Sequence, residues 1–456
     1  MGSSTNFKII SDCFIKPKFI SKEAQKPTYF SPWDLCMINV NYIQKGLLFP
    51  KPQNQDFSIT TFINNLKDSL SNTLTYFHPL AARLSTIKQQ NPTSFTIFIN
   101  PENSPGARFI HAVVNLTVDD ILTPTDVPLI VQSFFDHHKA IDHDGHEQSL
   151  LSAQVTELTD GIFIGCSINH MLVDGTSFWH FFNSWSEIFQ SSKIHNDVLV
   201  PISRPPVIKR WIPPGSEPIL TLPFTNESEF IERPNPPMLR ERIFHLTSHS
   251  LSRLKSKVNK ECNTTKISTL QCLSAVVWRC ITRARRFPYD KETGCRLAIN
   301  NRSRLSPPLP ENYFGNSIQA IRTTTTAGEL LDQSVGWTAQ RLHESVANHG
   351  DKEIREYMDM WVKSPFVYKV GVFFDGNSIQ MGSSPRFDMY GNEFGLGKGL
   401  AVLSGYANKF DGKVTLYEGR EGGGSMDLEV CLLPQNMVAF ESDEEFMSLV
   451  KGESEV

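Results

Sequence analysis

Along residues 161–190 the spacing of hydrophobic positions changes from that of a strand to that of a helix. Up to Ile168 the residues are mostly apolar and β-prone, which is typical of a buried strand. From Phe178 on, apolar residues recur at the i, i+3, i+4 and i+7 spacing of an amphipathic helix. Their positions are 178, 181, 182, 185, 188 and 189. Between the two patterns, Asp174-Gly175-Thr176 predicts a turn and a helix N-cap.

His170 and Asp174 stand at this junction of strand and helix. Such junctions lie at the rim of a sheet, where ligands tend to bind. An imidazole titrates near neutral pH, so His170 is a candidate general base that takes a proton from an attacking hydroxyl or amine. Asp174 would then orient the ring or hold the loop. The same pattern also fits a histidine that is only a hydrogen-bonded polar residue at a strand end.

The pattern predicts further elements before this stretch. A helix over 58–77 is expected to end at His78-Pro79, because the residue before a proline avoids the α region. Residues 149–158 are expected to pair with 161–169 as a hairpin. Other strands are predicted early in the segment 7–50 and at 36–49, 93–99 and 107–118, with a loop or short helical turn at 119–128.

Proline is concentrated in residues 200–237, which hold ten of the 28 prolines. Proline fixes the backbone and donates no hydrogen bond, so this segment is predicted to be a semi-rigid crossover. At 456 residues the chain exceeds the usual size of a single core, which favours two domains. We expect an N-terminal domain over 1–200, the crossover over 201–238 and a C-terminal domain over 239–456.

The second half shows a similar mixture of patterns. Strands are expected at 240–246, 295–300, 367–374, 400–407, 413–418 and 426–432, with a hairpin turn at Asp411-Gly412. Helices are expected at 268–286, 327–348 and 351–362, and from Ser442 onward. Lys255, Lys257 and Lys260 precede the first of these helices. They either bind a phosphate-bearing ligand or form a solvated helix face.

The motifs of the chain carry a family resemblance. His170 to Gly175 resembles the His-x-x-x-Asp-Gly signature of the plant BAHD acyl-CoA-dependent acyltransferases. Alone this motif is weak, but other blocks of the family follow in order along most of the chain. They are Ser31-Pro-Trp-Asp34-Leu, His78-Pro-Leu-Ala-Ala-Arg83, Ile267-Ser-Thr-Leu-Gln271, Asn301-Arg-Ser-Arg304, Tyr313-Phe-Gly-Asn316 and Glu393-Phe-Gly-Leu-Gly-Lys398.

The resemblance implies an α/β fold of two similar domains, each a mixed β-sheet flanked by helices, similar to chloramphenicol acetyltransferase. It also implies an active-site channel at the domain interface. Acyl-CoA, as a co-substrate, and a small-molecule acceptor would enter from opposite faces. His170 would deprotonate the acceptor hydroxyl or amine, which attacks the thioester without a covalent enzyme intermediate. No permanently bound cofactor and no metal are implied.

The resemblance also implies roles for individual residues. Asp174 would hold the loop through a salt bridge, and Gly175 would let the backbone approach the substrate. Glu393 stands where the family has a structural aspartate, with Arg302 as the expected partner, and Leu396 replaces a tryptophan. Ser384 would donate to the oxyanion. The further residues expected to contact substrates are Ser268, Arg302 and Lys257.

Composition narrows the classes of function. The net charge of −4 gives no general attraction to nucleic acid. The sequence has no apolar run long enough to insert in a membrane and no signal-peptide layout. Eight scattered cysteines predict reduced thiols, so we expect a cytoplasmic protein, and a monomer. Histidines and aspartates gather in 136–147, but their spacing fits no metal site, and a solvated loop is expected.

Two other functions remain open. The same fold could carry out a lyase or another non-transfer reaction on a single metabolite without coenzyme A, and the substitutions at Glu393 and Leu396 favour this alternative. A non-catalytic protein that binds a small molecule is the other alternative. The intact pair of His170 and Asp174 counts against both. Coenzyme A binding separates transferase from lyase, and loss of turnover in His170→Ala separates both enzymes from the binding protein.

Overall fold

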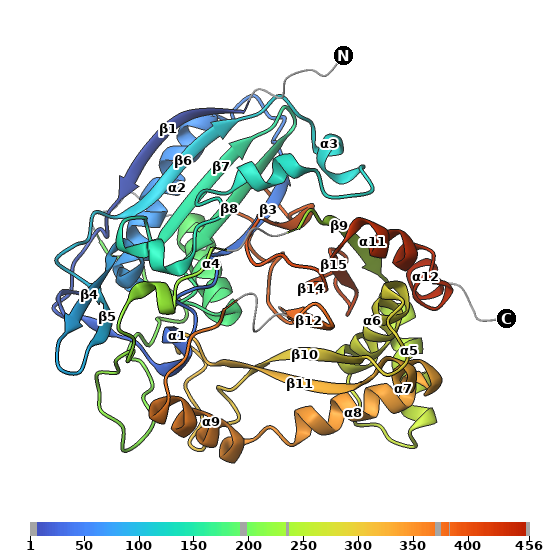
Figure 1. Ribbon diagram of the computed structural model, residues 1–456. Helices are drawn as coiled ribbons and strands as arrows, with labels where there is room; N and C mark the ends of the chain where they lie inside the picture. The colour runs from blue at the N-terminus through green and yellow to red at the C-terminus, as the bar shows by residue number, and fades with distance from the viewer. Residues whose placement is uncertain (1–6, 192–197, 234–236, 370–374, 383, 453–456) are drawn as a thin grey trace.

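The computed structural model describes residues 7–191, 198–233, 237–369, 375–382 and 384–452. It is a mixed α/β structure with two sheet-containing domains, as the sequence predicted, and Figure 1 shows the two sheets with their helices. The first six-stranded sheet has the order β1-β6-β7-β8-β3-β13, and the second has the order β11-β10-β12-β14-β15-β9.

The first sheet is built mainly from the N-terminal half. Its strands are β1 (Lys8–Ile15), β6 (Ala107–Val113), β7 (Leu151–Glu157), β8 (Gly161–Ile168), β3 (Ile43–Pro50) and β13 (Ala401–Ser404). The predicted hairpin is β7 and β8, paired antiparallel from Leu151 opposite Ile168. The helices α2 (Ile59–Tyr76) and α4 (Gly175–Gln190) share one hydrophobic core with these strands. Burial of that apolar face holds the strand-to-helix junction in place.

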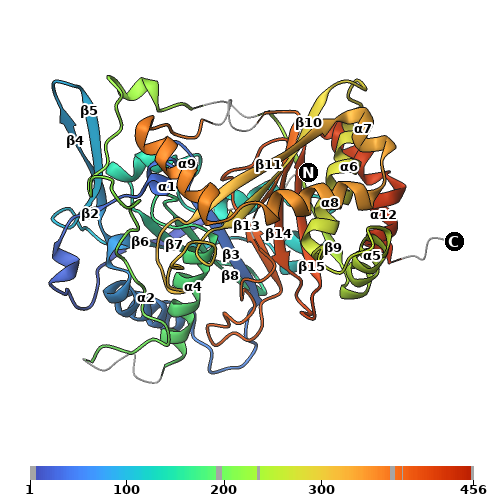
Figure 2. The ribbon, with the colours of Figure 1, turned by 90° about the horizontal axis from the view of Figure 1, so that it is seen from below.

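The second sheet lies in the C-terminal half. Its strands are β11 (Ile318–Thr326), β10 (Glu292–Asn300), β12 (Ser378–Gly382), β14 (Lys413–Glu418), β15 (Met426–Leu432) and β9 (Arg240–Leu246). A second core joins it to α5 (Ser248–Glu261), α6 (Thr269–Arg285), α8 (Val335–Ala347), α11 (Pro434–Glu441) and α12 (Glu444–Lys451). In Figure 2 several of these helices gather at the end of the molecule away from α2 and α4.

Shorter elements complete the fold. A three-stranded sheet consists of β2 (Thr28–Tyr29), β5 (Ser94–Asn100) and β4 (Arg83–Gln89). The remaining helices are α1 (Pro32–Leu35), α3 (Val118–Leu122), α7 (Ala327–Asp332) and α9 (Asp351–Lys363). Short 3₁₀ helices occur at Glu23–Gln25, His78–Ala81, Leu129–Phe134, Asp142–His146 and Glu227–Glu229.

Several predicted elements were wrong. The strand expected at 36–49 begins only at Ile43, because Ser31 and Asp34 cap the helical turn α1 just before it. The helix expected at 327–348 is two helices, separated where Ser334 caps α8. The strands β4, β11 and β12 and the helix α11 were missed. Of the strand expected at 367–374, residues 367–369 are irregular and residues 370–374 lie outside the described residues.

The hairpin expected at Asp411-Gly412 does not form either. β13 pairs antiparallel with β3 of the first sheet, from Ala401 opposite Leu48, whereas β14 pairs with β12 and β15. The C-terminal half thus supplies an edge strand to the sheet of the N-terminal half, and Figure 2 shows β13 beside β3. The division at 201–238 stays a prediction. Among the described residues, no helix combines the length and apolarity that crossing a bilayer requires.

Candidate active site

The loop between β8 and α4 is fixed at its backbone on both sides of His170. The N–H of His170 donates to Oδ1 of Asp142 at 2.7 Å. The side chain of Asn169, one residue earlier, donates to the carbonyl of Asp142 at 2.8 Å. On the other side, Asn316 donates through Nδ2 to the carbonyl of His170 at 2.7 Å. Hydrogen bonds from two distant segments therefore fix the backbone position from which the imidazole extends.

Asp174 is fully buried and accepts hydrogen bonds with both carboxylate oxygens. Oδ1 accepts from the N–H of Ser177 at 2.9 Å, which makes Asp174 the N-cap of α4. The guanidinium of Arg302 donates to Oδ2 at 2.6 Å and to Oδ1 at 3.0 Å, and the N–H of Ser317 donates to Oδ2 at 3.0 Å. Burial opposes ionisation, but Arg302 and these N–H groups hold the pKa of Asp174 below its usual value.

Arg302 therefore does not have the partner or the role expected from sequence. Its guanidinium is buried, pairs with Asp174, and also donates to Oγ of Ser177 and to the carbonyl of Gly315. It does not line the cavity described below, so the expected substrate contact is not seen. The expected pairing with Glu393 is wrong, since the Glu393 side chain is exposed and forms no ion pair with any described residue.

The second support of the His170 loop is a buried aspartate in α1. Oδ1 of Asp34 accepts from the N–H of Asn316 at 3.0 Å and from its Nδ2 at 2.9 Å. Its Oδ2 accepts from the hydroxyl of Ser31 at 2.7 Å and lies 3.3 Å from Nε of Arg210. Asp34 thus orients the amide that holds the carbonyl of His170. The motifs around Asp34 and Asn316 were recognised in the sequence, but their contact was not.

The environment of His170 favours the neutral imidazole. Burial lowers the pKa of His170 below its usual 6.5, and the charge of Lys413 lowers it further, although Asp174 acts in the opposite direction. Nδ1 is buried and forms no hydrogen bond with any described residue. The ring itself is partly exposed, so Nε2 is the nitrogen available to a ligand. A neutral imidazole can accept a proton, which is what a general base requires.

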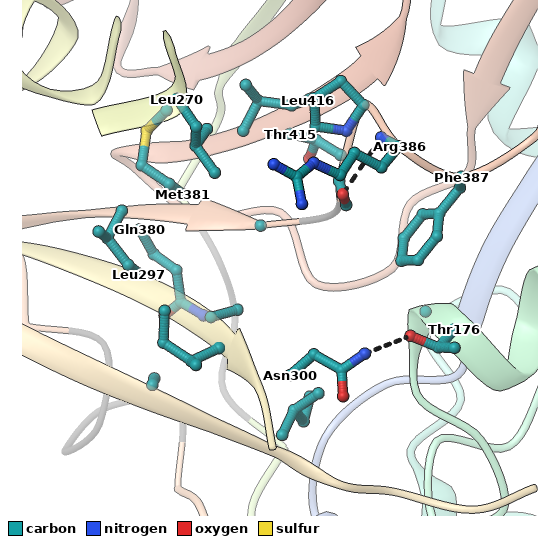
Figure 3. Close-up of a pocket in the computed structure, with 18 of the residues that line it drawn as sticks. Thr176, Leu270, Leu297, Asn300, Gln380, Met381, Arg386, Phe387, Thr415 and Leu416 are labelled. Carbon is teal, nitrogen blue, oxygen red and sulfur yellow. Dashed lines mark hydrogen bonds between the residues drawn. The ribbon is translucent and has the colours of Figure 1, made fainter. Parts of the chain in front are cut away.

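His170 opens into a cavity of about 980 Å³ lined by both halves of the chain. In Figure 3, Nδ2 of Asn300, at the end of β10, donates to Oγ1 of Thr176, at the start of α4, at 3.3 Å. Leu297, Gln380 and Met381 line the cavity from the second sheet. The side chains of Arg386 and Phe387 line it from a loop. The volume is at the upper end of small-molecule sites.

The predicted contact residues divide into two groups. Ser268, Gly175 and Ser384 line the cavity. A Cβ added to Gly175 would lie 3.1 Å from Cε2 of Phe387, so the glycine leaves room for that ring. Oγ of Ser384 accepts from the N–H of Arg386 at 3.2 Å, and the oxyanion role of Ser384 stays a prediction. Lys257 is exposed on α5 and does not line the cavity, which Lys255 of the same helix does.

The segment 136–147 is not the solvated loop that was expected. Asp142 is fully buried and His137 is nearly so. Burial raises the pKa of Asp142 well above its usual value, and its Oδ2 forms no hydrogen bond with any described residue. The local composition suggested exposure, but the segment folds against the His170 loop. Its backbone binds the segment between α1 and β3, where the N–H of Asp142 donates to the carbonyl of Val40 at 2.8 Å.

Among the described residues, one group of three side chains has a spacing that could hold a metal ion. It consists of Cys280, Asp443 and Glu445, and lies outside the cavity. Arg283 already forms ion pairs with both carboxylates, at 2.7 Å from Nη2 to Oε2 of Glu445 and also to Asp443. The group is therefore satisfied by an arginine, and its charge needs no cation.

Comparison with known proteins places the whole chain in one family. A family model described as "Transferase family" matches residues 6–447. An uncharacterized acetyltransferase of Arabidopsis thaliana is 36% identical over 445 residues, which cover 96% of this chain and 98% of the relative. The chain belongs to the BAHD acyltransferase family. The resemblance found in the motifs is thus confirmed.

Solved structures agree with this fold. Vinorine synthase has a TM-score of 0.73 at 19% identity, covering 97% of this chain and 98% of its own. TRI101 of F. sporotrichioides, crystallised with coenzyme A and T-2, has a TM-score of 0.71 at 18% identity, covering 93% and 98%. At these identities the likeness shows the fold alone, and it confirms the α/β fold similar to chloramphenicol acetyltransferase.

In this BAHD acyltransferase, sequence reasoning missed a group of lysines at the cavity. Lys45 of β3, Lys409 and Lys413 all line it, together with the buried Glu429 of β15. The residues come from positions far apart in the chain, and no motif contains more than one of them. The sequence offered one signal for this group, which is that Lys45 and Lys413 fall in or next to segments predicted to be strands.

Proposed function

We propose that this protein transfers an acyl group from acyl-CoA to a hydroxyl or amine of a small plant metabolite, with His170 as the general base. The observation that carries the proposal is that His170, held at its backbone N–H and carbonyl, lines a cavity that both halves of the chain form, where burial lowers the pKa of its imidazole. The acyltransferase family of the chain supports this reading. No specific observation favours a lyase or a binding protein.

The reaction needs one proton acceptor and no covalent enzyme intermediate. His170 removes the proton of the acceptor hydroxyl or amine as its oxygen or nitrogen attacks the thioester carbonyl. The tetrahedral oxyanion then collapses, the carbon–sulfur bond breaks, and the imidazolium returns the proton to the departing thiolate. General-base assistance of this kind contributes about 10²–10⁴-fold to the rate. Asp174 has a positioning role, because Arg302 and two backbone N–H groups already occupy its carboxylate.

Two observations support acyl-CoA as the donor. TRI101, which shares the fold, was crystallised with coenzyme A. The cavity of this chain also has cationic residues that suit a phosphate-bearing ligand, among them Lys255 on α5 and Arg304 beyond β10. Ser268, which caps α6 and lines the same side, is a further candidate contact. Coenzyme A is a co-substrate in this scheme, not a resident cofactor.

We also propose that the protein acts as a cytoplasmic monomer. All eight cysteines are unpaired, which suits a reducing compartment. Size-exclusion chromatography with light scattering tests the monomer, and a fluorescent fusion expressed in leaf cells tests the compartment.

The decisive experiment is release of free thiol from a panel of acyl-CoA donors, with a pooled plant extract as acceptor and products read by mass spectrometry. We expect acceptor-dependent thiol release that falls at least about a hundredfold in His170→Ala. The matched control is His249→Ala, because His249 is exposed on α5 and does not line the cavity. If an extract component changes mass in a His170-dependent way without release of thiol, the reaction is not acyl transfer from coenzyme A.

A further inference from the structure

The cavity is much more cationic than the chain as a whole. The chain carries a net charge of −4. The cavity lining nevertheless includes six basic residues and two acidic ones, a surplus of four positive charges with histidine neutral. The basic residues are Lys45, Lys255, Arg304, Arg386, Lys409 and Lys413, and the acidic residues are Glu418 and Glu429. A local surplus inside an acidic protein points to an anionic ligand.

Three of these residues, Lys45, Lys409 and Lys413, form what we call the lysine cluster, between the two sheets. Nζ of Lys45 donates to the hydroxyl of Tyr417 at 2.7 Å, and that hydroxyl donates to Glu429 at 2.8 Å. Nζ of Lys409 pairs with Glu241 at 2.5 Å. Two of the three lysines therefore have a fixed partner in the folded chain.

Lys413 is the lysine without such a partner. Among the described residues, no hydrogen bond or ion pair involves its ammonium group, although the side chain lines the cavity. Nζ lies against Gly382, where an added Cβ would collide with it. With Glu241 and Glu429 as the acids, the lysine cluster has one positive charge more than it has negative charges. One unpartnered ammonium and one surplus charge match a monoanion such as a carboxylate.

The position of Lys413 indicates which part of a substrate it meets. It lines the same cavity as His170, and its charge acts together with burial to lower the pKa of that imidazole. The phosphates of coenzyme A lie at the far end of the pantetheine arm from the thioester. A cation near the base therefore meets the acyl group or the acceptor, whereas Lys255 on α5 is available to the phosphates.

We propose that Lys413 binds a carboxylate that one of the two substrates carries close to the reacting atoms. This inference rests on the proposed acyl transfer and names a substrate class for it. The carboxylate belongs either to the acceptor, a hydroxy acid or amino acid, or to a dicarboxylic acyl group such as malonyl. Lys45 adds positive potential at the same place, since its charge acts on Lys413. A desolvated carboxylate requires such a partner.

The test compares matched substrates with and without the carboxylate. The acceptors are mandelate, tyrosine and 4-hydroxyphenyllactate, each beside its methyl ester, and the donors are malonyl-CoA beside acetyl-CoA. A charge-assisted hydrogen bond predicts a KM about ten- to a hundredfold lower for the acid member of the productive pair. Preference among acceptors assigns the carboxylate to the acceptor, and preference for malonyl-CoA assigns it to the acyl group.

Variants tie the preference to one side chain. Lys413→Met should raise the KM of the acid to that of the ester, and Lys413→Arg should keep part of the preference. The variant should fold, because Lys45 and Lys409 remain balanced by Glu241 and Glu429. Lys363→Met is the control, since Lys363 is exposed on α9 and does not line the cavity. Equal KM values for acid and ester, or a preference that survives in Lys413→Met, would overturn the inference.

Isothermal titration calorimetry separates this inference from the proposed function. If no donor is consumed, the same acids, esters and coenzyme A thioesters are titrated into wild type and Lys413→Met. If the carboxylate form binds more tightly than the ester in wild type but not in Lys413→Met, the carboxylate site is supported, although the proposed acyl transfer is then wrong. Equal dissociation constants for both members of every pair, while thiol release persists, would remove the carboxylate site and leave the transferase intact.

Discussion

Replacing Asp174 with asparagine should destabilise the protein more than it damages the chemistry. The substitution keeps the shape of the side chain, and the amide oxygen can still accept from the N–H of Ser177 as the cap of α4. It removes the negative charge that faces Arg302 at 2.6 and 3.0 Å. The guanidinium is buried, so its charge would be left without an ion-pair partner.

The magnitude follows from the burial of both partners. Removing one member of a buried ion pair typically costs about 3–5 kcal/mol, since the other charge stays desolvated. The retained cap and the hydrogen bonds from Arg302 to Ser177 and Gly315 place the expected loss at the lower end, at about 3 kcal/mol. The double variant Asp174→Asn/Arg302→Met removes both charges and should recover part of this loss.

Urea denaturation followed by tryptophan fluorescence measures the stability, and thiol release measures the activity. In the alternative, in which Asp174 relays a proton, Asp→Asn would cost about 10⁴-fold in kcat with the fold intact, as in the serine-protease triad that serves as the reference case. A stability change below about 0.5 kcal/mol together with such a loss of kcat would refute the positioning role. Because its pKa is depressed, the contribution of Asp174 is present above about pH 4 and is lost as the pH falls through the folded-state pKa.

Three further predictions concern the surroundings of His170. Burial raises the pKa of Asp142 and favours its protonated form, which an amide resembles, so Asp142→Asn should keep kcat. Asp142→Ala leaves the N–H of His170 without its partner and should cost about 1–3 kcal/mol in urea denaturation. Gly175→Ala places a Cβ 3.1 Å from the Phe387 ring, so it should raise the acceptor KM with little change in the thermal midpoint; an unchanged KM would contradict this. Burial and the charge of Lys45 lower the pKa of Lys413 to about 8, against the opposing charges of Glu429 and Cys431. The KM of acid acceptors, but not of their esters, should therefore rise above about pH 8 in initial-rate assays.

Local patterns were sufficient for the centre of the fold. The change of hydrophobic spacing between Ile168 and Phe178 correctly placed β8 and α4, and Asp174 is the cap that the sequence predicted. These elements depend on residues within a few positions of each other, so one sequence contains the information. The hairpin of β7 and β8 was predicted for the same reason.

Contacts between distant segments were not accessible in this way. β13 pairs with β3 of the first sheet, and its Leu403 packs in one core with Leu48. This packing depends on residues far apart in the sequence, so the local pattern of β13 does not indicate which sheet it joins. Asp142 was taken for a solvated residue because its neighbours are polar, whereas its burial depends on the N–H of His170. Arg302 was assigned to Glu393 from the family resemblance, whereas the folded loop pairs it with Asp174.

The position of Lys413 beside His170 also predicts that the base responds to the substrate. Burial lowers the pKa of His170, and the charge of Lys413 lowers it further. A bound carboxylate would offset that charge, so the pKa of His170 should rise when an acid substrate is present. The midpoint of the kcat–pH profile, which reports the base in the substrate complex, should then lie at a higher pH for an acid acceptor than for its ester.

Lys413→Met provides the internal control for this coupling. Without the ammonium group, acid and ester should give the same midpoint, and that midpoint should lie above the wild-type value for the ester. Coincident midpoints for acid and ester in the wild type, despite a difference in KM, would show that Lys413 binds the carboxylate without influencing the base. The electrostatic interaction between Lys413 and His170 would then be screened in the substrate complex, because substrate or water separates the two groups.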